Sequence, residues 1–105
     1  MPTYRATDAD VEHTEHLLAA HRELGHLRVR RWGALVTLES GPRDDPVAHI
    51  RFRRVAAGMW TLEMANHRGR WEPTGIHAAT IDDLLAMVLR DFPWTLAPAW
   101  PQDEP

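Results

Sequence analysis

Two histidines and their charged neighbours are the side chains of this sequence that best suit acid–base chemistry on a phosphate ester. His49 precedes Arg51 and His67 precedes Arg70, with Glu63 between the two pairs. Imidazole exchanges protons near neutral pH, and guanidinium groups bind phosphate oxygens through paired hydrogen bonds. If these groups lie on one side of the molecule, they could serve as the catalytic groups of a small nuclease-like enzyme that cleaves RNA by acid–base catalysis.

Joint proton transfer requires His49 and His67 to reach one scissile group, and these two histidines are the catalytic candidates. In an alternating strand His49 is expected to point to the same side as Arg51, while His67 is expected in a turn at one end of the sheet. The sequence shows no glycine-rich phosphate loop, no Ser/His/Asp set with a supporting motif and no convincing pair of carboxylates. We therefore favour a non-enzymatic protein.

Six arginines form a candidate site for anions or nucleic acid: Arg28, Arg30, Arg51, Arg53, Arg68 and Arg70. Alternation places the first four on one sheet face, and the last two are expected to border it. A basic sheet face suits RNA or DNA, but we expect no aromatic side chain on this face for base stacking. Pairing with glutamates on neighbouring strands would also neutralise several arginines. Nucleic-acid binding is therefore the alternative function.

The leading interpretation is a non-enzymatic association module that binds a second copy of itself or another protein. Trp60 and Trp71 suit a core. Exposed tryptophans near arginines mark interfaces. Further large apolar residues are hard to bury in a small domain, and we predict that they form the interface. These residues are Trp32, Trp94, Leu96 and Trp100.

A metal site is the weakest of the chemical hypotheses. Glu12, His13 and His16 fall within one turn of an expected helix. Their order is Glu-His-x-x-His, whereas the helical zinc motif is His-Glu-x-x-His. Cysteine is absent, so thiolate ligands and disulfides are excluded. We predict no metal and no cofactor.

Length and composition predict one domain over residues 1–105, with an ordered core of about 7–100 and a flexible tail at 101–105. The sequence has no apolar run long enough for a membrane helix and no pattern of a secretory signal. Together with the lack of cysteine, these features predict a cytoplasmic location and no membrane partner. The net charge is −3, and the two ends of the sequence are acidic whereas its middle is basic. The acidic ends could neutralise the basic middle within one molecule or across a dimer.

The elements that must position these side chains are two helices and four strands. A helix is expected to start after Thr7 and stop at Gly25, and a second to run over residues 81–92, after Thr80 and before Pro93. A long strand is expected over residues 27–39. Because its halves are out of phase by one residue, we predict a bulge or bend at residues 31–33.

Residues 46–73 predict the centre of the fold, three strands joined by turns at residues 56–58 and 66–69. Pro73 is expected to end the last strand or to lie at an edge, with residues 74–79 as a connection. The predicted fold class is α+β, in the order α-β-β-β-β-α. Four strands would form an antiparallel meander with both helices packed on one face, leaving an arginine-rich face open.

The central residues resemble a family of small bacterial proteins known as domain of unknown function thirty twenty-four. The residues that carry the resemblance are Pro46-Val47-Ala48, Arg51-Phe52, Gly58, Trp60-Thr61-Leu62 and Gly69-Arg70-Trp71. It continues into Leu84-Leu85, Asp91 and Trp94, and so covers roughly residues 27–94. The chain is divergent: Glu63 stands where the family tends to have tyrosine, and Asn66 where it favours aspartate. The resemblance implies a small bacterial protein and no particular activity.

Overall fold

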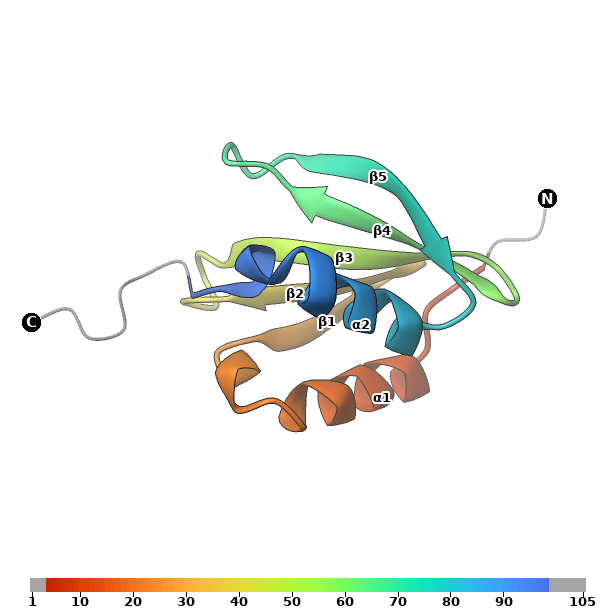
Figure 1. Cartoon of the computed structure of the whole chain (residues 1–105), viewed down its shortest axis with the longest axis horizontal. Coiled ribbons are helices and arrows are strands. Elements are labelled where there is room, and N and C mark those ends of the chain that lie inside the picture. The colour runs from red at the N-terminus through yellow and green to blue at the C-terminus, as the bar shows by residue number, and fades with distance from the viewer. Residues whose placement is uncertain (1–3, 99–105) are drawn as a thin grey trace, which may run out of the picture.

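Two helices pack on one face of a five-stranded antiparallel sheet in the computed structural model, which describes residues 4–98 (Figure 1). The strands follow the chain order β1-β2-β3-β4-β5. The elements are α1 Asp8–Ala19, the 3₁₀ turn η1 Arg22–Leu24, β1 Arg28–Trp32, β2 Leu35–Ser40, β3 Val47–Ala56, β4 Met59–Ala65, β5 Trp71–Ala78, α2 Ile81–Asp91 and the 3₁₀ turn η2 Pro93–Leu96. The α+β class is as predicted.

The prediction of four strands was wrong because the first expected strand is a hairpin. The chain reverses at Gly33, whose φ of 59° is in the left-handed region that glycine adopts without a steric penalty. Trp32 then pairs with Leu35, and Arg28 with Glu39. The slip in phase between the two halves is therefore a two-residue turn rather than a bulge.

The last strand is longer than expected, and this is a second correction. β5 includes residues 74–78, which the sequence indicated as a connection. Its pairing with β4 shifts register between Thr61 and Glu63, and Gly75 has a φ of 79° within this irregular stretch. Pro73 lies within β5, at an edge of the sheet, where its missing N–H breaks no ladder.

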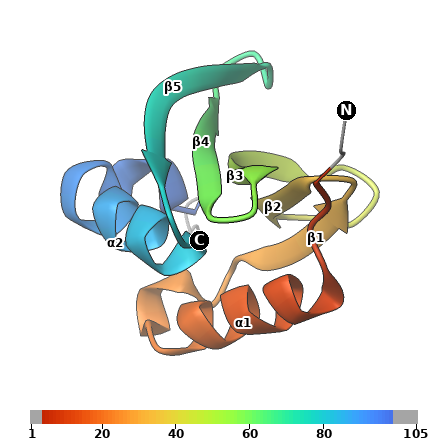
Figure 2. The same ribbon diagram turned by 90° about the vertical axis from the view of Figure 1, so that its right-hand side faces the viewer.

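Both helices begin at the capping residues that the sequence predicts. The Thr7 hydroxyl accepts from the Asp10 amide, and the Asp10 carboxylate accepts from the Thr7 amide. The Thr80 hydroxyl accepts from the Asp83 amide. Figure 2 shows α1 and α2 on the same side of the sheet, so that within the described residues no helix covers the opposite face.

The core lies between the helices and one face of the sheet. α2 contributes the apolar stripe that its spacing predicts, and alternate residues of β2, β3 and β4 meet it. The core residues are Ala6, Leu18, Leu24, Val36, Leu38, Ile50, Phe52, Trp60, Leu62, Ile81, Leu84, Leu85, Val88 and Leu96. Because this face is occupied, the alternating side chains in between must lie on the other side, which we call the open face.

Candidate functional site: the open face of the sheet

Four of the predicted arginines share the open face, as alternation requires. Arg28 and Arg30 on β1 lie opposite Glu39 and Thr37 on β2, and the pairing continues from Thr37 to Arg51 and from Leu35 to Arg53. Directly opposed residues of antiparallel strands lie on the same face of the sheet. The register therefore places all four guanidinium groups on the side away from the helices.

Glu63 neutralises much of the charge of one arginine pair. Arg51 Nε donates to Glu63 Oε1 at 2.6 Å, and Arg53 Nε donates to Glu63 Oε2 at 2.8 Å. Burial raises the pKa of Glu63, but the hydrogen bonds and charges of Arg53 and Arg51 outweigh burial and lower the pKa below its ordinary value. The guanidinium of Arg51 also stacks over the Trp71 ring, 4.4 Å from its centroid.

Glu39 plays the same part for the other arginine pair. Arg30 Nε donates to Glu39 Oε1 at 2.8 Å, and Arg28 Nη2 lies 3.3 Å from Glu39 Oε2. Arg28 also donates to the carbonyl of Gly41 at 2.6 Å, which ties it to the β2–β3 loop. Two carboxylates thus offset half of the charge of four arginines, and the middle of the face is an ion-pair ladder.

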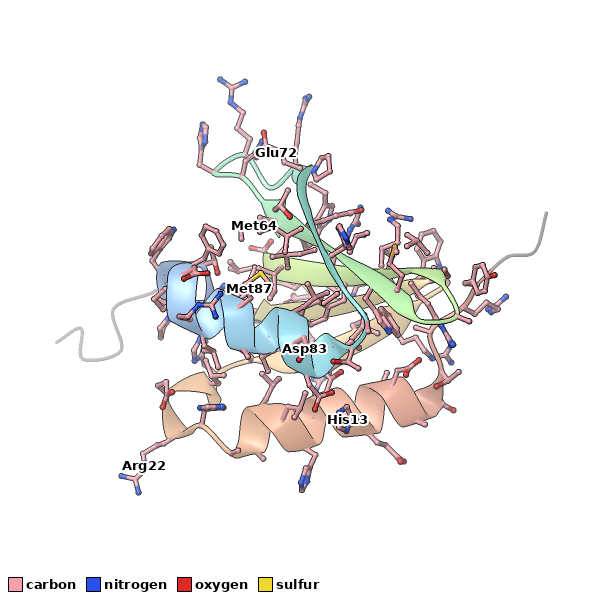
Figure 3. All side chains as sticks on the ribbon, turned by 45° about the vertical axis from the view of Figure 1, so that its right-hand side comes forward. His13, Arg22, Met64, Glu72, Asp83 and Met87 are labelled. Atoms are coloured by element: carbon pink, nitrogen blue, oxygen red, sulfur yellow. The ribbon has the colours of Figure 1, made fainter. Side chains whose placement is uncertain are left out.

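Arg68 and Arg70 stand apart from this ladder, in the turn between β4 and β5. The Asn66 side-chain oxygen accepts from the backbone amides of both arginines and so shapes the turn. The hairpin projects away from the helices in Figure 1, and Figure 3 shows Glu72 near its tip. Both arginines are exposed. The predicted set of six therefore divides into a paired group on the face and an exposed pair at the hairpin tip.

His49 points away from the open face, contrary to the prediction that it would share a side with Arg51. The register shift between Leu38 and Glu39 leaves His49 as the extra residue of a β-bulge. Its Nδ1 donates to the Thr95 carbonyl at 2.8 Å, and its Nε2 accepts from the Ser40 hydroxyl at 2.7 Å. The bulge thus turns the ring toward η2, on the helix side of the sheet.

The structure does not bring His49 and His67 together as an acid–base pair. His49 is 6% exposed with both ring nitrogens engaged, whereas His67 lies in the exposed 66–69 turn. Burial lowers the pKa of His49, the Thr95 carbonyl opposes this, and nearby His26 lowers the pKa further. A buried neutral imidazole that holds η2 has a structural role, so the geometry gives the nuclease hypothesis no support.

The predicted interface residues divide between surface and core. Trp32 is 74% exposed and Trp94 is 67% exposed, whereas Leu96 is 1% exposed and belongs to the core. Placing Leu96 at an interface was wrong, because the η2 turn folds it back onto the sheet under α2. Trp100 lies outside the described residues. Of the two tryptophans expected in the core, Trp60 is buried and Trp71 is half-buried under Arg51.

Three of the four exposed large apolar side chains in residues 4–98 gather at one end of the sheet: Trp32, Val55 and Met59. The β1–β2 and β3–β4 turns both lie at this end, since alternate turns of a meander share an end of the sheet. A groove of about 360 Å³ beside Trp32 is lined by Arg5, Trp32, Gly33, Ala34, Leu35 and Arg53. We call Trp32, Leu35, Val55 and Met59, with Arg5 and Arg53 at the rim, the turn-end surface.

Sequence reasoning found Trp32 but missed Arg5, Val55 and Met59. An available signal was the position of the hairpin turns, since alternate turns of a meander lie at the same end of the sheet. The position of the first turn follows only when residues 27–39 are treated as two strands rather than one. The same fold-back puts Trp32 on the open face, so the expectation of an arginine face without an aromatic side chain was wrong.

Of the residues suggested for a metal, His13 is engaged elsewhere. His13 Nε2 lies 2.6 Å from Asp82 Oδ1 and links α1 to α2; Figure 3 shows His13 on α1 near the start of α2. Within residues 4–98 no three His, Cys, Asp or Glu side chains lie together as metal ligands would. Across that same range, none of the helices has the length and apolarity to span a membrane.

Comparisons with known proteins return no match: no family model, no curated protein and no solved structure matches this chain. The resemblance noted over residues 27–94 therefore stays an expectation.

Proposed function

We propose that this chain is a non-enzymatic association module whose turn-end surface binds another protein. The observation that supports this most is the gathering of Trp32, Val55 and Met59 at one end of the sheet. Tryptophan, methionine and arginine are enriched where proteins bind one another, and exposed large apolar side chains gathered at one end of a small domain are typical of such a site.

The edges of the sheet favour binding through this surface rather than by strand addition. β5 carries Pro73 and the irregular stretch at Gly75, which interrupt the row of backbone groups that an added strand would need. β1 has only five residues, three of them arginines, so a second β1 strand would bring like charges together. A partner therefore meets side chains rather than a free strand edge.

The rim of the turn-end surface indicates the chemistry of the partner. Arg5 and Arg53 flank the Trp32 groove, and Arg53 keeps a side chain that is 40% exposed despite its bond to Glu63. Arginine at an interface favours carboxylates and also packs on apolar groups. The complementary partner carries acidic side chains next to an apolar or aromatic one.

A peptide-display selection against the full chain tests this function. We expect enriched peptides to combine acidic and apolar residues and to lose binding to the Trp32→Ser variant. Trp94→Ser is the matched control, because Trp94 is also an exposed tryptophan but lies on η2. A selection that yields no peptide dependent on Trp32, or equal losses in both variants, would contradict the proposal.

Nucleic-acid binding is the second candidate, and one observation favours it. Trp32 lies on the open face, where an exposed ring can stack on a base, and Arg68 and Arg70 are exposed at the hairpin tip. Glu39 and Glu63 count against it, since they neutralise much of the arginine ladder. Titration of single-stranded RNA and DNA at increasing salt is the test. Absence of binding at low salt would eliminate this candidate, because phosphate contacts strengthen as salt falls.

We further propose a cytoplasmic location, which the absence of cysteine supports. Fractionation of cells that express the tagged chain measures it. Recovery with a membrane or extracellular fraction would contradict this assignment.

A further inference from the structure

We infer that the turn-end surface of one copy binds residues 98–105 of a second copy, so that chains associate head to tail. The inference rests on the proposed function and names its partner.

The groove can hold one large apolar side chain between two cations. Trp32 and Leu35 supply its apolar wall, and Arg5 and Arg53 stand at its rim. Its volume of about 360 Å³ is at the small end of ligand sites, which suits a short extended segment better than a helix. A segment with an aromatic side chain followed by carboxylates would place the ring against Trp32 and the charges near the arginines.

Residues 98–105, Pro-Ala-Trp-Pro-Gln-Asp-Glu-Pro, have this composition. Trp100 is followed by Asp103 and Glu104, and the spacing of Pro98 and Pro101 is P-x-x-P. Proline-rich segments dock in aromatic-lined grooves and lose little entropy on binding, because the pyrrolidine ring already restricts φ. The opposite signs of segment and rim add charge complementarity.

In the same molecule Trp100 follows η2 by too few residues to reach the groove. His49 anchors the Thr95 carbonyl, and chain geometry limits Trp100, four residues after Leu96, to about 14 Å beyond it. Arg53 lies about 13 Å along β3 from His49, and Trp32 lies two strands, or about 10 Å, further across the sheet. The path must also pass around an edge of the sheet to the open face. The neighbour's segment has no such limit.

A contact between two different surfaces has a distinctive consequence. After two copies pair, the pair as a whole keeps one free groove and one free segment, so association does not stop at a dimer unless a ring closes. The basic rims also disfavour the symmetric alternative, in which two turn-end surfaces face each other.

The first experiment measures binding of a dye-labelled peptide with the sequence of residues 97–105 to the full chain by fluorescence anisotropy. Trp32→Ser is expected to weaken binding at least about tenfold, as removal of a central aromatic anchor does, and Trp94→Ser to leave it unchanged. A peptide carrying Trp100→Ser should also bind at least about tenfold more weakly. Because Trp32 is 74% exposed, the variant should fold, and a circular-dichroism spectrum is the check on this.

The second experiment tests the head-to-tail arrangement by mixing variants. The wild-type mean mass from light scattering should rise with concentration beyond that of a dimer, while the Trp32→Ser and Trp100→Ser chains should each stay monomeric. An equimolar mixture of the two variants should form a two-chain complex and nothing larger. A wild-type chain that stays monomeric at high concentration, or a mixture without complexes, overturns the inference.

The two proposals fail in different ways. If display-selected peptides need Trp32 but the 97–105 peptide does not bind, the association function stands and the self-docking inference is wrong. If neither class of peptide depends on Trp32, both are wrong. Binding of the peptide that is equally weakened by Trp94→Ser also overturns the inference, because the site would then be η2.

Discussion

Replacing Glu63 by glutamine tests whether the ion-pair ladder stabilises the open face. Glu63 accepts from Arg51 at 2.6 Å and from Arg53 at 2.8 Å, and its side chain is only 12% exposed. Hydrogen bonds to a charged group contribute about 1.5–3 kcal/mol each when buried. Here both arginines can regain water, Arg53 more than Arg51, so we expect a total loss of about 2 kcal/mol rather than the full sum.

A domain of about 100 residues loses about 4–8 °C in Tm per kcal/mol, so the Glu63→Gln variant should melt about 8–16 °C lower than wild type. Glu72→Gln is the matched control, because it makes the same change in charge. Glu72 is exposed, and its one partner among residues 4–98 is the Asn66 side-chain amide, which donates to it at 3.2 Å. The control should therefore stay within about 0.5 kcal/mol of wild type. Thermal melting measures the shift in Tm, and urea titration, which leaves ionic strength unchanged, measures the difference in the free energy of unfolding.

The stability difference between wild type and Glu63→Gln should also depend on pH. Because the arginines lower the folded-state pKa of Glu63, its contribution is present above the ordinary carboxyl pKa and is lost as pH falls through the folded value. The stability gap between wild type and Glu63→Gln should therefore close in acid. A Glu63→Gln variant as stable as Glu72→Gln at neutral pH would refute the reasoning. So would a gap between wild type and Glu63→Gln that persists in acid, where the Glu63 carboxyl is protonated.

Three other predictions concern residues that the fold places in special positions. Because burial lowers the folded-state pKa of His49, the wild-type free energy of unfolding should decrease as pH falls below 6.5, and His49→Gln should show a weaker dependence in urea titrations between pH 7.5 and 5. Leu96→Ala should cost about 2–4 kcal/mol by loss of core packing, and Trp94→Ala under about 1 kcal/mol; equal losses would contradict the placement of η2. Gly33→Ala should cost about 1–2 kcal/mol because of its positive φ, whereas Gly58→Ala, with open space around its α-carbon and no positive φ, should be close to neutral by thermal melting.

Local patterns in the sequence were sufficient for much of the fold. Thr7 and Thr80 cap the helices because each hydroxyl accepts a hydrogen bond from the free backbone amide three residues later. This interaction is local and depends little on the rest of the fold. The alternation in β3 and β4 likewise sorts side chains onto two faces, which correctly grouped Arg51 with Arg53 and set Phe52 and Leu62 in the core. These features depend on neighbours a few residues apart.

The candidate site needed information that no short window contains. A slip in alternation at residues 31–33 fits a bulge as well as a turn, and only the pairing of Trp32 with Leu35 shows that the chain reverses there. That reversal sets Trp32 beside Arg53 and creates the turn-end surface. His49 was assigned to the wrong face for a related reason, since a bulge in the pairing with β2 turns it over.

The sequence by itself therefore determined where both helices begin, the central strands and which side chains alternate, because backbone capping and strand periodicity are local; it placed the end of the first helix at Gly25, whereas α1 ends at Ala19. Tertiary structure alone decided the number of strands, the burial of Leu96, the side taken by His49 and the placement of Trp32 and Met59 at the same end of the sheet. Those outcomes depend on strand register and on packing between segments far apart in the chain, where a shift of one residue moves a side chain to the opposite face.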